Sequence, residues 1–144
     1  MIYWFTGQPG AGKTTLAKAL IENCSDTCIH IDGDELRDIF QNYDYTTRGR
    51  EKNMNSVLDL CRFLDKKNFT VVVSVVAPYK VMRDSLKETN VVTEIYVHTN
   101  KIRGREKFFV KDYEPPTKNF IDIDTTKLTI KECLKKIKFT PKNK

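Results

Sequence analysis

The sequence predicts an α/β protein in which a central parallel sheet of five strands is covered by helices on both faces, a three-layer αβα arrangement. Short apolar runs alternate with segments of helical periodicity along the 144 residues. The run "FTVVVSVV" at 69–76 is β-branched and apolar throughout, which is typical of a parallel strand buried on both faces. No repeat or low-complexity linker divides the chain, so we expect one domain over residues 1–144.

Each predicted element rests on its own composition and periodicity. Strands are predicted at 2–6, 27–31, 69–76, 92–98 and 119–123. Helices are predicted at 13–23, at 32–40 after a turn, and at 50–67, 79–89 and 129–137. Because ligands of such sheets bind at the carboxyl ends of the strands, we expect the functional residues to lie in the loops that follow them.

Composition limits the classes of function. The hydrophobic share of 40% and the charged share of 31% are those of a globular protein. The N-terminus has no signal-peptide pattern and no apolar stretch is long enough to cross a membrane, so we expect a cytoplasmic protein without a membrane partner. The net charge of +6 suits an anionic partner such as a nucleotide or a nucleic acid.

The four cysteines do not form a strong metal-binding pattern. Cys24 and Cys28 with His30 offer three zinc ligands, but no fourth ligand is near them in the sequence. We therefore expect small buried thiols in a reducing cytoplasm.

A glycine-rich loop follows the first predicted strand. Residues 7–14, "GQPGAGKT", fit the P-loop pattern G-x-x-x-x-G-K-[ST] between a strand and a helix. Such a loop points backbone N–H groups at phosphates, Lys13 reaches the β- and γ-phosphates, and the Thr14 hydroxyl is a ligand of Mg²⁺. The sequence therefore predicts that ATP and Mg²⁺ are bound. The predicted cofactor-binding residues are Gly7, Gly10, Ala11, Gly12, Lys13, Thr14 and Thr15.

Two common classes of P-loop protein lack their other motifs here. A GTPase needs N-K-x-D, but the segment "TNKIR" carries Arg103 where the aspartate belongs. A motor-type ATPase needs an aspartate at the end of an apolar strand, and the strand at 69–76 is followed by Ala77 and Pro78. Metal support and a catalytic base must therefore come from elsewhere in the chain.

The segment "HIDGDELR" supplies both. Asp32 and Asp34 directly follow the second predicted strand, where one carboxylate can hold a Mg²⁺-bound water and the other can face an acceptor hydroxyl. Arg37 lies about one helical turn beyond Asp34 and can clamp an anionic acceptor. The alternative reading of this segment is a turn with a helix N-cap.

The ordered set of motifs resembles the adenylyl-sulfate kinase family. That family uses MgATP to phosphorylate the ribose 3′-hydroxyl of adenosine 5′-phosphosulfate in sulfate assimilation. The resembling segments, in chain order, are "GQPGAGKTTLAKAL", "IDGDELR", "YTTRGREKNMNSVLDLCRFL", "VVVSVVAPYKVMRD", "KDYEPP" and "IDIDTT". The set covers most of the chain, and it is more specific than the P-loop alone.

The resemblance implies roles for individual residues. Asp32 orders Mg²⁺ and its waters, Asp34 is the catalytic base, and Lys13 stabilises the transfer together with Mg²⁺. Arg37 contacts the acceptor substrate. An arginine and an asparagine that hold the sulfonucleotide fall on Arg50 and Asn53.

Aromatic groups and a basic lid complete the implied acceptor site. The ring that stacks on the adenine falls on Tyr45, and Ser74 begins the turn after the third strand. The lid, residues 99–111, offers Phe108 or Phe109 as a second stacking ring. A solvated basic loop is the alternative reading of the lid, whose charges are Lys101, Arg103, Arg105 and Lys107.

Two departures from the family leave the acceptor open. Asn55 and Ser56 stand where the family carries two arginines, and the lid is shorter than the family's. The same fold can serve another small nucleotide acceptor, such as cytidine diphosphoramidate. A kinase of polynucleotide ends and a nucleotide-binding regulator without catalysis are the remaining alternatives, although we do not expect nucleic acid to be the partner. A homodimer is expected only because members of the family are often dimers.

Overall fold

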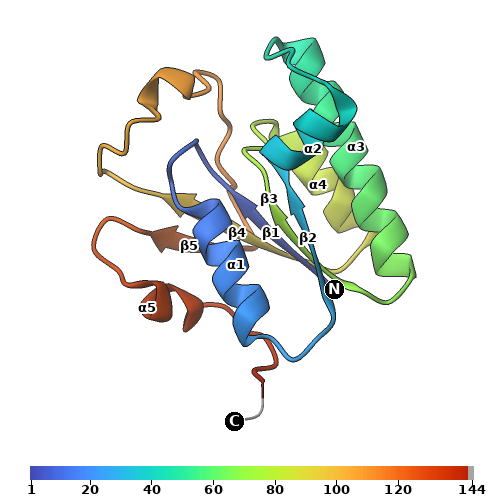
Figure 1. Ribbon diagram of the computed structural model, residues 1–144, viewed down its shortest axis with the longest axis vertical. Helices are drawn as coiled ribbons and strands as arrows, with labels where there is room; N and C mark the ends of the chain where they lie inside the picture. Colours follow the sequence, from blue (N-terminus) through green and yellow to red (C-terminus); the bar gives the residue numbers. More distant parts are fainter. Residues whose placement is uncertain (143–144) are drawn as a thin grey trace.

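Five strands form one parallel sheet in the computed structural model, which describes residues 1–142. The strand order is β2-β3-β1-β4-β5. The strands are β1 (Ile2–Thr6), β2 (Cys28–Asp32), β3 (Thr70–Ser74), β4 (Val92–His98) and β5 (Phe120–Asp124). The helices are α1 (Lys13–Asn23), α2 (Gly33–Phe40), α3 (Thr47–Lys66), α4 (Lys80–Thr89), α5 (Ile130–Leu134) and the 3₁₀ turn η1 (Glu106–Phe108) (Figure 1).

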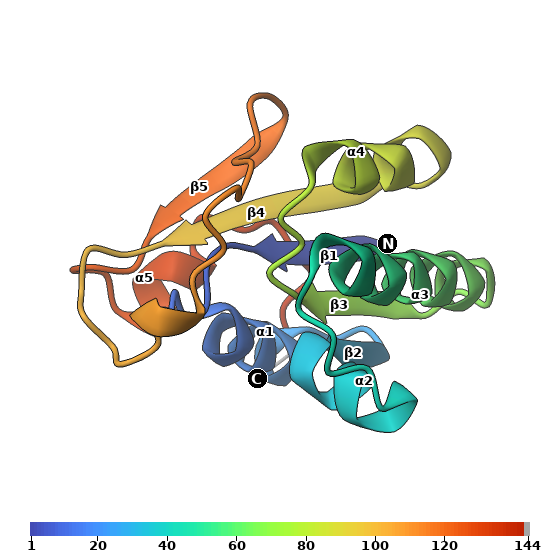
Figure 2. The same ribbon diagram turned by 90° about the horizontal axis from the view of Figure 1, so that it is seen from above.

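Helices cover both faces of the sheet, which confirms the predicted three-layer fold. The helices α1 and α5 lie on one side, and α3 and α4 lie on the other (Figure 2). Leu16 and Leu20 of α1 belong to the core on the first side, whereas Met54 and Val57 of α3 belong to the core on the second. The strand β1 lies between β3 and β4 and is buried along its whole length. Its end therefore holds the loop that follows it at the centre of the sheet edge.

Two boundaries near the cavity differ from the predictions by two or three residues because local geometry overrides periodicity. The helix predicted from residue 50 begins at Thr47, since the Thr46 hydroxyl caps it by accepting a hydrogen bond from the Gly49 N–H at 3.4 Å. The strand predicted to reach residue 76 ends at Ser74. Shortly after it the backbone turns at Ala77, whose φ of +48° lies in the left-handed region. Both differences place side chains of the site described below.

The last predicted helix is shorter than its apolar pattern suggested. It ends at Leu134 rather than at residue 137, because the following turn is closed by tighter bonds from Lys136 N–H to the Cys133 carbonyl and from Ile137 N–H to the Leu134 carbonyl. The turn η1 in the lid was not predicted. No helix within residues 1–142 is long and apolar enough to cross a membrane.

Candidate active site

A cavity of about 870 Å³ opens at the carboxyl ends of β1, β2 and β3 and is bordered by the lid. It brings together predicted residues from five separate segments of the chain. These are Gly10, Gly12, Lys13, Thr14, Thr15, Asp32, Asp34, Arg37, Tyr45, Arg50, Asn53, Ser74, Phe108 and Phe109. The predicted residues Gly7 and Ala11 do not line the cavity but lie in the loop beside it. A single hollow thus holds the candidate ATP groups and the candidate acceptor groups.

The P-loop takes its shape from glycines and its charge from a helix end. A side chain at Gly7 would clash with the carbonyl of Val97. The loop can therefore pass this close to β4 only because residue 7 is a glycine. Gly12 is the N-cap of α1 with a φ of 109°, and no side chain caps this helix end. The first N–H groups of α1 are therefore available to phosphate oxygens, which the helix dipole also attracts.

Lys13 is a buried cation at the base of the cavity. Only 8% of the residue is exposed, and its Nζ donates a hydrogen bond to the Gln8 carbonyl at 2.8 Å. Burial lowers the pKa of Lys13 to about 8, although the Asp34 carboxylate acts to raise it and Arg105 acts to lower it further. Phosphate groups would supply the negative charge that this buried ammonium lacks.

Asp32 ends β2 and is held by hydroxyl groups. Its Oδ1 accepts hydrogen bonds from Thr14 Oγ1 and from Ser74 Oγ, each at 3.0 Å. Its Oδ2 accepts a hydrogen bond from the Glu35 N–H at 3.3 Å, so Asp32 also caps α2. The functional and the capping readings of this residue are therefore compatible.

His30 is a neighbour of this group that the sequence suggested only as a zinc ligand. Its Nε2 lies 2.7 Å from Ser74 Oγ, which in turn contacts Asp32. Burial lowers the pKa of His30, while the Asp32 carboxylate acts to raise it. The signal that could have revealed this role is the spacing of His30 from Asp32, because side chains two residues apart on a strand lie on the same face. This contact to Ser74 places His30 in the polar network at the end of β2.

Arg37 lines the part of the cavity that holds the candidate acceptor groups. The residue is only 7% exposed, and its Nη1 donates to the backbone carbonyls of Asn42 at 3.0 Å and Asp44 at 3.1 Å. Its guanidinium lies 4.2 Å from the centre of the Tyr45 ring, within cation–π range. Arg37 therefore orients Tyr45 as well as lining the cavity.

The same part of the cavity also contains a buried polar atom without a hydrogen-bond partner in the described chain. Asn53 is 5% exposed, and its Oδ1 is buried without a hydrogen-bond partner within the described chain. Such an oxygen is costly unless a ligand donates to it. Asn55 and Ser56 do not line the cavity, and the Ser56 hydroxyl instead donates to the Lys52 carbonyl at 3.2 Å. Among the predicted groups of α3, the positive charge in the cavity comes from Arg50.

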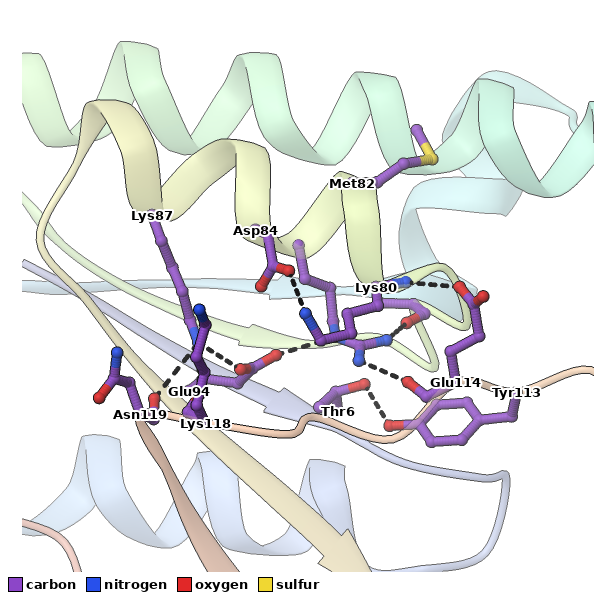
Figure 3. A network of polar contacts seen from close by, with 12 residues as sticks. Thr6, Lys80, Met82, Asp84, Lys87, Glu94, Tyr113, Glu114, Lys118 and Asn119 are labelled. Atoms are coloured by element: carbon purple, nitrogen blue, oxygen red, sulfur yellow. Dashed lines mark hydrogen bonds and ion pairs between the residues drawn. The ribbon is translucent and has the colours of Figure 1, made fainter.

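A buried ion pair that was not predicted supports the cavity wall at Ala77. Arg83 of α4 and Glu94 of β4 are each 2% exposed, and Arg83 Nε lies 2.8 Å from Glu94 Oε2. The Arg83 guanidinium also donates to the carbonyls of Ala77, which lines the cavity, and of Glu114. Figure 3 shows Glu94 with Lys87, and Glu114 beside Lys80, within this network.

The donor set fits the cofactors that the sequence predicted. Mg²⁺ prefers hard oxygen ligands and usually keeps several waters beside one or two protein groups and substrate phosphates. Thr14 Oγ1 and Asp32 Oδ1, which lie 3.0 Å apart, are such oxygens beside Lys13. In the described part of the chain no cluster of three or more His, Cys, Asp and Glu residues could hold a metal. ATP phosphates and water molecules would supply further oxygen ligands to a bound Mg²⁺.

Comparisons with known proteins agree with this geometry. The family described as adenylylsulphate kinase matches residues 1–121. A cytidine diphosphoramidate kinase from Campylobacter jejuni is 29% identical over 85% of this chain and 77% of its own length. A probable adenylyl-sulfate kinase from Archaeoglobus fulgidus is 29% identical over 88% of this chain and 96% of its own.

A solved structure extends the likeness to the fold. The APS kinase of Mycobacterium tuberculosis, in complex with AMPPNP and APS, superposes with a TM-score of 0.75 at 18% identity over 91% of each chain. The family and its curated relatives make the protein an ATP-dependent kinase, with Mg²⁺ as the usual metal, that transfers phosphate to a hydroxyl group. The chain belongs to the adenylylsulphate kinase family.

Proposed function

We propose that the protein transfers the γ-phosphate of ATP to the ribose 3′-hydroxyl of a nucleotide that carries an anionic group at its 5′ end. Adenosine 5′-phosphosulfate is the first candidate acceptor. The observation that carries the proposal is the shared cavity, which Asp34 lines together with Lys13 of the ATP side and Arg37 and Arg50 of the acceptor side. The Asp34 carboxylate acts on the charges of both Lys13 and Arg37. The single sheet supports the prediction of one kinase domain, whose residues 143–144 lie outside the described part.

The proposed mechanism assigns each step to a group of the chain. Asp34 accepts the proton of the 3′-hydroxyl, whose oxygen attacks the γ-phosphorus while the bond to the leaving ADP oxygen breaks. Lys13 and the N–H groups of α1 neutralise the charge that develops on the phosphoryl oxygens. Thr14 and water molecules ordered by Asp32 would hold Mg²⁺, which would supply further charge neutralisation.

The acceptor is held by charged and polar groups at its anionic end and by aromatic rings at its base. Arg50 and the free edge of Arg37 pair with the 5′ anionic group, and Asn53 Oδ1 accepts a hydrogen bond from the nucleotide. Tyr45 stacks on the base from one side, and Phe108 or Phe109 of the lid from the other. Ser74 borders the same pocket while its hydroxyl donates to Asp32.

Cytidine diphosphoramidate is a second candidate acceptor. Two observations favour it: Asn55 and Ser56 place no positive charge in the cavity, and one relative bears the name cytidine diphosphoramidate kinase. A terminal phosphoramidate also carries N–H donors that a sulfate lacks, and these suit a buried acceptor such as Asn53 Oδ1. Location in the cytoplasm and a homodimer remain predictions.

One assay separates the candidates. The protein is incubated with γ-labelled ATP, Mg²⁺ and either adenosine 5′-phosphosulfate, cytidine diphosphoramidate or a single-stranded oligonucleotide, and the label in each product is counted. We expect label in one of the two small nucleotides and a rate of labelling at least about 100-fold lower with Asp34→Asn. Label in the oligonucleotide alone would refute the proposal. The proposal would also be refuted if no nucleotide became labelled although calorimetry showed that ATP binds. That result would favour a nucleotide-binding regulator.

A further inference from the structure

One side chain of the P-loop contacts the lid directly. Gln8 Nε2 donates a hydrogen bond to the Val110 carbonyl at 2.8 Å, and Gln8 Oε1 accepts one from the Val110 N–H at 2.9 Å. The side-chain amide thus pairs with both backbone groups of one residue, as a neighbouring strand would. Two bonds of this kind fix the position and also the orientation of the backbone at Val110.

We propose that Gln8 is a positioning residue that ties the end of the lid to the P-loop and so holds the lid aromatics over the cavity. Val110 is 5% exposed, and it directly follows Phe108 and Phe109, which line the cavity. The backbone carbonyl of Gln8 accepts the hydrogen bond from Lys13 Nζ at 2.8 Å. One residue therefore touches both the catalytic lysine and the lid.

A second contact fastens the beginning of the lid to the same loop. Arg103 Nη1 donates to the carbonyls of Gly10 at 3.1 Å and Ala11 at 3.0 Å, and Nη2 donates to the Thr125 carbonyl at 3.2 Å. Between the two anchors, the Glu106 carboxylate accepts hydrogen bonds from the N–H groups of Arg103, Gly104 and Arg105. The short lid is thus an internally braced turn with both ends attached to the P-loop.

The two anchors have different consequences for the reaction. The Gln8 contact lies next to the two phenylalanines, whereas the Arg103 contact lies on the phosphate side of the lid. Loss of the Gln8 amide would release residues 107–110 while Arg103 stays attached. This part of the lid would then move away from the acceptor more often and admit water. Water competes with the acceptor for the γ-phosphate.

The first test uses Gln8→Met, which keeps the side-chain volume but cannot pair with Val110. Trypsin cleavage after Lys107 and Lys111, on either side of the anchor, is followed in the full chain without nucleotide. Proteolysis of a locally opened segment tracks the population of the open form. Two lost hydrogen bonds should raise that population, and the cleavage rate, about tenfold.

A matched control removes another side-chain amide. Asn23 Nδ2 donates to the Ala19 carbonyl at 2.8 Å near the end of α1, so Asn23→Met loses a hydrogen bond that does not involve the lid. We expect this variant to be cleaved at the wild-type rate and both variants to keep the wild-type unfolding temperature within a few degrees. Equal cleavage of Gln8→Met and wild type, or equal acceleration in both variants, would overturn the proposal.

The second test asks whether the anchor serves the reaction, and it rests on the proposed function. The ratio of ADP formed to acceptor phosphorylated is measured with the nucleotide that the wild type labels best. Gln8→Met should raise this ratio and the KM for the acceptor more than it lowers kcat. Faster cleavage with an unchanged ratio would overturn the positioning role. If the wild type labels no nucleotide, the proposed function fails, while the cleavage rates still decide whether Gln8 anchors the lid.

Discussion

The ATP side and the acceptor side of the cavity are built in different ways. On the ATP side, Lys13 is 8% exposed and Asp32 is held by the hydroxyls of Thr14 and Ser74. On the acceptor side, the stacking rings are exposed, 56% for Tyr45 and 53% for Phe108. The groups proposed to perform the transfer are thus held at the edge of the sheet, whereas the rings proposed to stack on the acceptor base stand on a loop and on the lid. Acceptor choice can therefore change without a change in the chemistry.

The largest expected effect is on kcat, and it comes from Asp34, which is proposed to act where the ATP side meets the acceptor side. Asp34→Asn keeps the shape of the side chain but removes the proton acceptor, so kcat should fall by roughly 10²- to 10⁴-fold. ATP affinity, measured by calorimetry, should change little because Asp34 is assigned to the acceptor hydroxyl. Turnover close to wild type would show that the base lies elsewhere in the cavity.

A charge on the acceptor side should affect the acceptor alone. Arg50→Ala removes the cation of α3 that lines the cavity, and loss of a charge-assisted hydrogen bond should raise the acceptor KM by about 10- to 100-fold. The KM for ATP should remain near its wild-type value. Arg48→Ala is the matched control, because Arg48 lies on the same helix outside this cavity and should leave both constants unchanged. Equal effects of the two variants would contradict the assignment.

The ATP side should respond to pH through Lys13. Its pKa of about 8 lies below the ordinary 10.5, and bound phosphates favour the charged form. Above pH 8 the free protein must take up a proton to bind ATP, so affinity should fall by up to about tenfold per pH unit. Calorimetry at pH 7, 8 and 9 checks this slope. Lys13→Arg, which stays charged, should show no such slope.

Unfolding does not explain that loss of affinity. Lys13 has a lower pKa in the folded chain than in the unfolded chain, so the unfolded state binds more protons between pH 8 and 10.5. The contribution of Lys13 to the free energy of unfolding therefore increases over that window. ATP binding and this stability contribution should change in opposite directions as the pH rises.

The smallest expected effect concerns stacking. Tyr45→Ala removes a ring that Arg37 orients, and loss of one base–aromatic contact should raise the acceptor KM by about tenfold. Tyr45→Phe keeps the ring and should leave the KM nearly unchanged. If Tyr45→Ala altered the KM for ATP instead, the division of the cavity into two sides would be wrong.

Local patterns were sufficient where a function depends on neighbouring residues. The P-loop is contiguous, so its motif predicted the glycine loop and the helix at Lys13–Asn23 with the observed bounds. The strands β1 and β3 were recognised because buried parallel strands are continuously apolar, and the other three were recognised as short apolar runs between helical patterns. The end of the third strand was missed, since the left-handed turn at Ala77 has no glycine to mark it.

Contacts between distant segments left no such pattern. Gln8 and Val110 are 102 positions apart, and their pairing uses the backbone of Val110, which any residue would offer. The Arg83–Glu94 pair reads in the sequence as ordinary helix and strand charges until α4 and β4 pack together and bury both.

By itself the sequence determined the α/β architecture, the phosphate-binding loop and the Asp32–Asp34 pair, because each depends on periodicity or on spacing along a short stretch of chain. Only the tertiary structure decided that Arg37 braces Tyr45, that His30 contacts Ser74 and that the lid is held by the P-loop. These contacts arise from strand order and loop closure. A hydrogen bond forms wherever folding brings a donor to an acceptor, whatever their separation in the sequence.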